Sequence, residues 1–513
     1  MTKIEIKRAI VSVHDKSCLS LLADYFIKYK IEVLSTGGTA RFLKNYSAKL
    51  KIIEISEFTN FSEILDGRVK SLHPKIHSGI LAKKKDKNHI KELKKINTPY
   101  IDLVVVNLYP FEKVVNDQKS GKQKCIENID IGGPTLIRGA AKNYDNVTVL
   151  TDPNQYNSFL EIVYKNHNQI PKSFRELCAI VAFEKTSYYD GVISNWFNKD
   201  NPNFCNEKIS LIFNKISQLR YGENPHQKAA LFNLKDNPLI KISGKDLSFN
   251  NIYDLEVAME LAQQFQESSC VILKHGNPCG VALDRKQHIA FDKALNCDKI
   301  SAFGGIVAFN KKLASQTAKK IKNLFIEVVI APDFSLESKN ILSTKKNLIL
   351  IQYNATNSKT SLHLKTTRNF LLLQNKDNKV INKKDLIIKT KIAPSDKEKK
   401  DMIFSFIISK YLNSNAIVLA QNQATVGIGV GQMNRLEAAK QAIKQMKSNF
   451  KKYNPVLASD GFFPFSDIVK LCSKNNIKGI IQPGGSKNDK EVIDVANKNK
   501  ISLVLTGIRH FKH

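Results

Sequence analysis

Short apolar segments rich in β-branched residues alternate with amphipathic segments near both ends of this chain, and this alternation constrains the fold most. RAIVSV at 8–13 predicts a strand, SCLSLLADYFIKY at 17–29 an amphipathic helix, and IEVLST at 31–36 a second strand. Two glycines then lead into a further helical segment, TARFLKN. From residue 401 onward, IFSFIISKYL, ATVGIGVG, RLEAAKQAIKQM and IKGIIQPGG resume the same rhythm. Strands that alternate with helices predict an α/β fold.

The length of 513 residues exceeds what one hydrophobic core supports and suggests about three domains. We place a first domain at 1–197, where a long helical segment ends. The polar, breaker-rich stretch NKDNPNFCNEK at 198–208 is a predicted linker. A second α/β region follows at 209–513. Within it, a segment rich in Lys, Asn, Ser and Thr at about 335–400 is the expected join between two sub-domains.

Composition excludes several classes of protein. No run of about 18 apolar residues occurs, so we expect no membrane-spanning helix. The start, MTKIEIKRAIVSVHDK, has the pattern of neither a signal peptide nor a transit peptide. The eight cysteines are scattered and form no C-x-x-C. This argues against a disulfide framework or a zinc knuckle and favours a reducing, cytoplasmic setting.

The charge is strongly positive, with 79 Lys and Arg against 47 Asp and Glu, a net +32. Such a balance is compatible with nucleic-acid binding. However, the lysines are spread along the chain among many asparagines and isoleucines, with few aromatic residues between them. We therefore interpret the charge as a compositional bias on solvated faces, expect no nucleic-acid partner, and note that anionic small molecules would fit.

Two basic or glycine-rich stretches in the first domain are candidate ligand sites. STGGT at 35–39 lies between a predicted strand and a predicted helix, which favours a phosphate cradle over a plain turn. GRVKSLHPKIHSGILAKK at 67–84 places Arg68, Lys70, His73, Lys75 and His77 close together in a loop-like stretch. It suits an anionic substrate, with a solvated basic loop as the alternative. Two histidines four residues apart do not make a metal site here, because a proline separates them and no third ligand is near.

The stretch VILKHGNPCG at 271–280 is the most informative of the second region. Its apolar start predicts a buried strand of a parallel sheet, which would put Lys274 and His275 at the carboxyl end where such sheets bind ligands. The two bases are either a proton-transfer pair or residues of a turn that reach solvent. The pattern His275-x-x-Pro278-Cys279 lacks the H-x-E and the second cysteine of zinc deaminases, so metal-free acid–base chemistry remains. A neighbouring ammonium disfavours the imidazolium and keeps the histidine available as a base.

Other segments are less specific. LRYGENPHQKAAL at 219–231 has Arg220 and Tyr221 before a turn, where they could grip a phosphate or stack on a ring. SAFGGIVAF and VGIGVGQMNR are glycine-rich strand edges, and glycine there could serve close packing alone. Core packing is the default interpretation of SDGFFPF at 459–465.

The order of STGGT, GRVKSLHPKIHSGIL, NLYPF, ENIDIGGPTLIRGAAKN, LRYGENPHQ, VILKHGNPCG, SAFGGIVAFN, VGIGVGQMNR, DGFFPF and TGIRHFKH resembles one family along nearly the whole chain. It is the family of bifunctional purine-biosynthesis enzymes that are both aminoimidazole carboxamide ribotide (AICAR) transformylase and inosine monophosphate (IMP) cyclohydrolase. The resemblance implies an N-terminal α/β domain with a methylglyoxal-synthase-like parallel sheet. It also implies two cytidine-deaminase-like α/β sub-domains without zinc, and a homodimer that shares its transformylase site.

For formyl transfer, the resemblance implies 10-formyltetrahydrofolate as cosubstrate and AICAR as acceptor, with no metal. His275 would take the proton of the attacking amine, Lys274 would stabilise the oxyanion or protonate the leaving folate nitrogen, and Asn415 would orient the carboxamide. The other implied contacts are Asn251 with the carboxamide, Arg220 and Arg509 with the phosphate, and Arg435, Phe463 and Pro464 on the folate side.

For ring closure of formyl-AICAR, the resemblance places Lys70 near the oxyanion, Tyr109 as proton donor, and Asp130 and Lys142 on the reacting groups. The implied phosphate contacts are Ser12, Lys16, Ser35, Thr36, Gly37, Gly38 and Thr39. The remaining implied substrate contacts are Arg68, Gly132 and Gly133 in the first domain, and Tyr221, Gly304, Glu327 and Asp460 in the second region. The sequence departs from the family pattern at His14, Asn369, Phe370, Gly461 and Glu327, of which His14 bears on the phosphate contact.

Two other classes of function stay as alternatives. A basic nucleic-acid-binding protein would account for the charge, and a regulatory module that binds a nucleotide phosphate would account for STGGT. The regulatory module gives no role to Lys274, His275 and Asn415, whereas the nucleic-acid-binding protein predicts basic residues clustered on one face and salt-sensitive binding.

Overall fold

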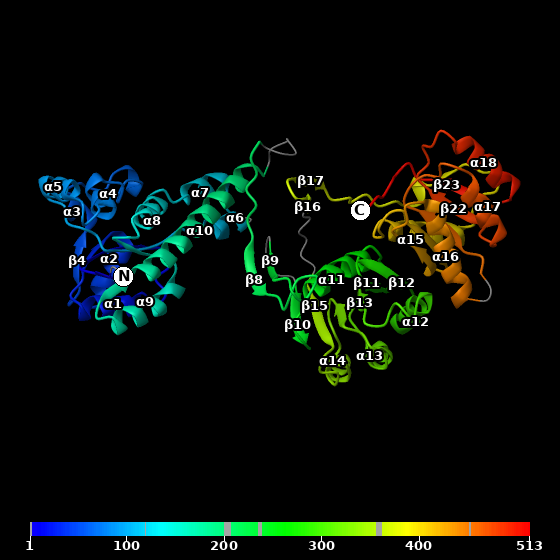
Figure 1. The fold of residues 1–513 in the computed structure, drawn as a ribbon, viewed down its shortest axis with the longest axis horizontal. Helices are drawn as coiled ribbons and strands as arrows, with labels where there is room; N and C mark the ends of the chain where they lie inside the picture. Colours follow the sequence, from blue (N-terminus) through cyan, green and yellow to red (C-terminus); the bar gives the residue numbers. More distant parts are fainter. Residues whose placement is uncertain (1–2, 118, 200–206, 234–238, 355–361, 451–452) are drawn as a thin grey trace. The chain divides into compact units, whose positions relative to one another are not determined.

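The computed structural model describes the chain in two compact units, Met1–Ile212 and Phe213–His513 (Figure 1). The described residues are 3–117, 119–199, 207–233, 239–354, 362–450 and 453–513. Most of the predicted linker, 200–206, lies outside them. Within these ranges, none of the helices combines the length and the apolar character needed to cross a bilayer.

The first unit is built on a five-stranded parallel sheet with the spatial order β4-β3-β2-β5-β6. Its strands are β2 (Arg8–Val13), β3 (Glu32–Ser35), β4 (Lys51–Glu54), β5 (Leu103–Asn107) and β6 (Thr148–Leu150). A short antiparallel ribbon pairs β1 (Lys3–Glu5) with β7 (Gln169–Pro171). The predicted strand at 8–13 and the predicted parallel sheet of this domain are confirmed. The apolar residues of β2 and β5 are the centre of the core.

Helices flank this sheet, as the alternation of segments predicts. They are α1 (Leu19–Lys28), α2 (Gly37–Tyr46), α3 (Ile55–Thr59), α4 (Pro74–Leu81), α5 (Lys87–Lys95), α6 (Phe111–Asn116), α7 (Lys122–Glu127), α8 (Gly132–Lys142), α9 (Tyr156–Lys165) and α10 (Lys172–Phe197). The long helix α10 packs against α8 and β6 (Figure 1).

The basic stretch at 67–84 is not the loop that its composition suggests. Helix α4 begins at Pro74, and the imidazole of the preceding His73 accepts a hydrogen bond from the Lys75 backbone N–H at 3.1 Å. A proline is tolerated at the first helical position because no N–H is needed there. The loop expectation is therefore wrong for residues 74–81, where the proline starts a helix.

The second unit is built on a twelve-stranded sheet with the spatial order β10-β15-β14-β13-β11-β12-β20-β19-β21-β22-β23-β18. Its first six strands along the chain are β10 (Leu239–Ser243), β11 (Ser269–Lys274), β12 (Asn277–Leu283), β13 (Ile306–Phe309), β14 (Val328–Ala331) and β15 (Ile349–Tyr353). The other six are β18 (Ile387–Ile388), β19 (Ile417–Gln421), β20 (Ala424–Gly429), β21 (Val456–Ser459), β22 (Gly479–Gln482) and β23 (Ser502–Leu505).

The two halves of this sheet have the same topology. In the first half, β11 pairs antiparallel with β12 and β13, β13 to β15 are parallel, and β10 is an antiparallel edge. In the second half, β19 occupies the place of β11, and β20, β21, β22, β23 and β18 repeat the pattern. The halves join where Ala282 of β12 pairs with Ala424 of β20. This repeat supports the interpretation of two related sub-domains.

Helices cover the sheet in matching positions, and apolar clusters lie between the layers. They are α11 (Phe249–Ala262), α12 (Gln287–Cys297), α13 (Ser315–Lys322), α14 (Leu336–Ser343), α15 (Asp396–Ser409), α16 (Arg435–Asn449), α17 (Asp467–Lys474) and α18 (Asp489–Lys498). Two hairpins lie outside the main sheet: β8 (Asn214–Gln218) with β9 (Ala230–Asn233), and β16 (Leu362–Thr366) with β17 (Leu371–Asn375).

One expectation for this unit is wrong. The apolar run at 271–273 predicts a strand with parallel neighbours, but β11 is antiparallel to both β12 and β13. After Lys274 and His275 the chain turns back at once into β12. A continuous apolar run reports burial of both faces, and a central antiparallel strand that is covered by helices has the same pattern.

Candidate active sites

The candidate site of the first unit lies where the strand order of its sheet reverses. Strands β2 and β5 are neighbours, and their connections leave in opposite directions along the sheet. Open parallel sheets bind ligands at such switch points, beyond the carboxyl ends of the strands. A cavity of about 710 Å³ occupies this position and includes Ser12 at the end of β2 and Asn107 at the end of β5.

All but two of the residues predicted for ring closure and its phosphate contacts line this cavity. They are Ser12, Lys16, Thr36, Gly37, Gly38, Thr39, Arg68, Lys70, Tyr109, Asp130, Gly132 and Gly133. The first exception is Ser35, which is buried and donates a hydrogen bond to the Val11 carbonyl at 2.7 Å. Ser35 therefore ties β3 to β2 rather than facing the cavity.

One corner of the cavity has the chemistry of an anion site. Helix α2 begins at Gly37, so its first N–H groups have no partner within the helix. The Lys16 ammonium lies beside Gly38, 3.8 Å from where a Cβ would stand. The Thr39 hydroxyl accepts from the Val13 N–H at 3.1 Å and donates to the Val13 carbonyl at 3.0 Å, which fixes this turn against β2. Helix N–H groups and a cation together favour a phosphate.

Two further cations that line the cavity are already paired. Lys70 lies 3.0 Å from a Glu63 carboxylate oxygen, and Arg68 forms an ion pair with Glu127. All four of these side chains are partly exposed, so solvent screens both pairs. A bound anion could therefore compete for either cation.

Asp130 and Tyr109 provide groups for proton transfer. Burial raises the pKa of Asp130 above its ordinary value, although the Gly133 N–H donates to its carboxylate at 2.8 Å and opposes the rise. A Cβ at Gly133 would lie 2.5 Å from this carboxylate, so a larger residue there would displace the Asp130 side chain. The half-exposed Tyr109 ring meets the His14 ring edge-on at 5.5 Å.

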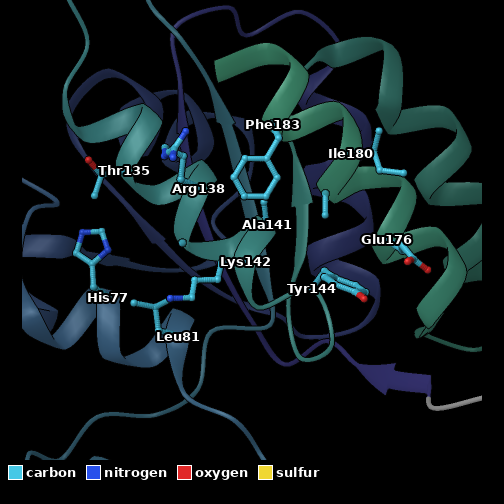
Figure 2. Close-up of a pocket in the computed structure, with 12 residues that line it drawn as sticks. His77, Leu81, Thr135, Arg138, Ala141, Lys142, Tyr144, Glu176, Ile180 and Phe183 are labelled. Atoms are coloured by element: carbon cyan, nitrogen blue, oxygen red, sulfur yellow. The ribbon is translucent and has the colours of Figure 1, made fainter. Parts of the chain in front are cut away.

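Lys142 is the second residue predicted for ring closure that does not line the cavity of about 710 Å³. It lies at a different cavity. This cavity, of about 690 Å³, is formed by α4, α8 and α10 and is mainly apolar (Figure 2). Figure 2 shows Lys142 near Leu81, and Arg138 near Phe183. The Arg138 guanidinium lies 5.6 Å from the centre of the Phe183 ring. Within one chain, Lys142 does not line the cavity that holds Lys70, Tyr109 and Asp130.

The candidate site of the second unit surrounds the turn between β11 and β12. The Lys274 ammonium donates to the Phe303 carbonyl at 2.7 Å, and His275 is exposed at the turn. The side-chain amide of Asn277 donates to the His275 carbonyl at 3.1 Å and accepts from the Asn413 N–H at 3.1 Å. Asn277 thereby links the turn of the first half to the segment that carries Asn415.

Asn415 lies in the second half of the unit. Its backbone N–H and its side-chain amide both donate to the Gln432 carbonyl, at 3.1 and 2.8 Å. The neighbouring Ser414 donates its hydroxyl proton to Asp460. These bonds hold the Asn415 segment beside the glycine-rich end of β20.

Arg435 and Asp460 form a buried ion pair, with 3.2 Å between the guanidinium and a carboxylate oxygen. The Arg509 guanidinium stacks on the Phe511 ring at 4.4 Å. Phe463, expected to line a ligand, is completely buried in the apolar core of this half, whereas Pro464 is partly exposed. The Phe463 ring is therefore not on the surface of the site.

Asn251 and Glu327 meet on the first half. The Asn251 amide donates to Glu327 at 3.1 Å, and its oxygen accepts from the Ser248 N–H at 3.1 Å at the start of α11. Gly304, at a φ of 72°, donates its N–H to the Phe325 carbonyl at 2.8 Å.

Arg220 is exposed, and its guanidinium lies 5.2 Å from the centre of the Tyr221 ring. The loop that follows is tied to α11, because Asn250 donates to the Glu223 carbonyl at 3.3 Å. These contacts tie the predicted transformylase residues to neighbouring segments in both halves of this unit.

Comparison with known proteins identifies the family. The AICARFT/IMPCHase bienzyme family model matches residues 140–445, and the MGS-like domain model matches residues 19–135. A protein of Caldicellulosiruptor saccharolyticus named "Bifunctional purine biosynthesis protein PurH" is 44% identical over 99% of this chain and 100% of its own. Proteins of the same name from Clostridium acetobutylicum and Thermoanaerobacter sp. are 45% and 44% identical at the same coverage. The chain belongs to the AICARFT/IMPCHase bienzyme family.

As a member of this bienzyme family, the protein is a bifunctional enzyme of purine biosynthesis with AICAR transformylase and IMP cyclohydrolase activities. Among solved structures, one described as "Crystal structure of ForH" is 30% identical and covers 37% of this chain and 99% of its own, with a TM-score of 0.33. In the described part of the bienzyme, no three His, Cys, Asp or Glu side chains are grouped to hold a metal ion.

Sequence reasoning missed several residues of both sites. Asn107 accepts from the N–H groups of His14 and Asp15 at 2.7 and 2.9 Å and shapes the wall of the first cavity. Asn107 could have been found from the sequence, because it is a polar residue at the end of an apolar strand. Glu63 and Asn277 carry no signal that composition or periodicity could detect, since their roles depend on partners brought near by folding.

Proposed function

We propose that the two activities occupy separate sites, with ring closure in the unit Met1–Ile212 and formyl transfer in the unit Phe213–His513. The observation that carries this proposal is the grouping of the predicted residues. Apart from Ser35 and Lys142, those for ring closure line one switch-point cavity. Lys274 and His275 lie at the β11–β12 turn, which Asn277 links to the segment that carries Asn415. We further propose, by family resemblance, a cytoplasmic homodimer that shares its transformylase site.

Formyl transfer joins the 5-amino nitrogen of AICAR to the formyl carbon of 10-formyltetrahydrofolate and releases tetrahydrofolate. In this proposal His275 takes the proton of the attacking amine, and the Lys274 ammonium stabilises the oxyanion that forms. The ammonium carries three donors, of which one is used by the Phe303 carbonyl, so others remain for the substrate.

The surroundings of Lys274 fit a folate. The rings of Phe303 and Phe325 are exposed and lie 4.8 Å apart beside it. Flat, exposed aromatic side chains bind flat aromatic ligands by stacking. Asn415 would orient the AICAR carboxamide, while Arg220 and Arg509 provide cations for its phosphate.

Ring closure joins the carboxamide nitrogen of formyl-AICAR to its own formyl carbon and releases water. The phosphate would bind at the start of α2 with Lys16, which places the rest of the nucleotide along the cavity toward Lys70. Lys70 would stabilise the oxyanion, and Tyr109 and Asp130 would exchange protons. Burial keeps the pKa of Asp130 raised, which suits a carboxyl that must give as well as take a proton.

Purified protein and its Lys70→Ala and His275→Ala variants test the proposal when tetrahydrofolate and IMP are followed separately after addition of AICAR and 10-formyltetrahydrofolate. Lys70→Ala should release tetrahydrofolate without IMP, and His275→Ala should fail to release tetrahydrofolate yet still close supplied formyl-AICAR. The unaltered protein is the reference, and both products are expected from it. Tetrahydrofolate without IMP from the unaltered protein would contradict the ring-closure assignment and direct attention to His14. Neither product from a folded sample would contradict the whole proposal and favour the nucleic-acid or regulatory alternative.

A further inference from the structure

The turn that carries His275 has an unusual backbone. His275 and Gly276 are the two central residues between β11 and β12, and their φ angles are 53° and 71°. Two successive positive φ angles make the tight turn whose twist matches a hairpin. Glycine adopts this conformation readily, whereas a histidine needs support from its surroundings. The N–H groups of both residues also need acceptors outside the strand ladder.

Asp254 provides both acceptors. Its two carboxylate oxygens accept from the His275 N–H at 3.0 Å and from the Gly276 N–H at 2.7 Å. Asp254 lies on α11 and is buried, with 8% of its surface exposed. Burial raises the pKa of this carboxyl, and the two backbone hydrogen bonds oppose the rise. One buried carboxylate therefore clamps the backbone of the proposed general base.

The second half of the sheet has the same arrangement, in which a buried aspartate accepts from two backbone N–H groups of a turn. Asp401 lies on α15, the counterpart of α11, and accepts from the N–H groups of Asn422 and Gln423 at 2.9 and 2.6 Å. These two residues form the β19–β20 turn, with φ angles of 55° and 53°. Asp401 is also buried, with 4% exposed, and burial likewise raises its pKa. Both halves therefore have a turn held by a buried aspartate, but only the turn held by Asp254 carries a proposed catalytic residue, His275.

We propose that Asp254 is a positioning residue of formyl transfer, which acts by fixing the His275 backbone so that the imidazole meets the amine of AICAR. This role rests on the proposed function of His275. Asp254 is buried and each of its oxygens accepts from the turn, so in this proposal it acts on the turn and not on a substrate. Its contribution to formyl transfer is therefore indirect, because it fixes the position of the His275 imidazole.

The alternative is that Asp254 serves folding alone, as Asp401 does. The repeat supplies a matched control, because Asp254→Asn and Asp401→Asn remove the same carboxylate from the same type of turn. In each variant the amide keeps one acceptor and opposes the second N–H with its own donor. Both variants should lower the melting temperature by similar amounts. A role in positioning should affect formyl transfer only in the first.

The test uses the full-length enzyme with AICAR and 10-formyltetrahydrofolate and determines kcat, KM and melting temperature for both variants. We expect Asp254→Asn to lower kcat for formyl transfer roughly 10- to 100-fold with little change in the KM for AICAR, the cost of a misplaced catalytic group. Asp401→Asn should leave kcat unchanged. Ring closure of supplied formyl-AICAR should be unchanged in both variants.

A second readout separates positioning from a general loss of structure. In a His275→Ala background, Asp254→Asn should cost no further formyl transfer, because its effect passes through the missing imidazole. If the Asn variants do not fold, Asp254→Glu and Asp401→Glu form the matched pair, with the same asymmetry expected.

Three results would overturn the positioning role: equal losses of kcat in both members of a pair, an unchanged kcat in the Asp254 variants, or an undiminished loss in the His275→Ala background. Absence of formyl transfer by the unaltered enzyme would instead refute the proposed function, and the positioning role with it. These outcomes are distinguishable, because only the last appears before any substitution is made.

Discussion

Lys70 and Glu63 form an ion pair, with 3.0 Å between the ammonium and a carboxylate oxygen, at the cavity of the first unit. Glu63 lies seven positions before Lys70, across a turn in which Leu65, Asp66 and Gly67 all have positive φ angles. A Cβ at Gly67 would lie 2.5 Å from both the Glu63 carboxylate and the Lys70 side chain, so glycine permits the pair. The turn thus presents a cation to the cavity while a carboxylate holds it.

Replacing Lys70 by alanine should impair ring closure alone. Loss of a donor to an oxyanion typically costs about 100-fold or more in kcat. IMP formation from supplied formyl-AICAR should fall by this amount, whereas tetrahydrofolate release should be unchanged. Lys75→Ala is the matched control, because Lys75 lies on α4 outside the residues that line this cavity. Equal damage to both half-reactions at unchanged stability would contradict the assignment of separate sites.

Asp130→Asn should lower the rate of ring closure and raise the melting temperature. Burial raises the pKa of Asp130 above 3.8, so the folded protein retains this proton to higher pH than the unfolded chain does. Folding stability therefore falls as pH rises through the interval above 3.8, and asparagine escapes this loss.

The Asn variant keeps an oxygen that can accept from the Gly133 N–H, whereas Asp254 uses both of its oxygens. It should therefore melt higher than the unaltered enzyme near pH 7, and the difference should vanish as pH falls below 3.8. Ring closure should drop about 100-fold, the scale of a positioned proton-transfer group. Melting curves across pH and a ring-closure assay check both parts. A variant that melts lower at neutral pH would show that the carboxylate stabilises the fold instead.

His275→Ala should lower formyl transfer at least about 100-fold, because a positioned general base contributes on this scale. Ring closure should be unaffected. His288→Ala, on α12 of the same unit, is the control for loss of a histidine without a proposed role. Parallel assays of tetrahydrofolate and IMP provide the measurement, and a His275 variant with full formyl transfer would remove this residue from the mechanism.

Asp460→Ala should destabilise the second unit strongly. The Asp460 carboxylate is completely buried and the Arg435 side chain is 11% exposed, so removal of one partner leaves a buried charge. Such a change typically costs about 3–5 kcal/mol. The exposed pair of Glu437 and Lys440, with 2.7 Å between its charged atoms, supplies the control.

Glu437→Ala should cost less than about 1 kcal/mol, as exposed pairs do. Urea unfolding of both variants measures the difference. Similar losses in the two variants would mean that the buried pair is no more important than a surface one.

Local patterns in the sequence predicted a large part of the first unit. The strand expected at 8–13 coincides with β2, and the helix expected at 17–29 contains α1. Hydrophobic periodicity is a local property, so it can be read without knowledge of pairing. The stretch STGGT at 35–39 likewise lies at the start of α2, because a strand end, small residues and a helix start are adjacent in the chain.

Tertiary structure alone decided which strands pair and which side chains meet. The apolar run at 271–273 determined that β11 is buried. It did not determine that β11 pairs antiparallel with β12 and β13. The sequence singled out Lys142 by resemblance, yet the path of α8 brings it to the cavity shown in Figure 2. Asp254 shows the reason most clearly. It lies 21 positions before His275, and only the packing of α11 against β11 brings its carboxylate to the turn. Residue type and spacing determine local conformation and burial, whereas contacts between distant segments depend on how the elements pack.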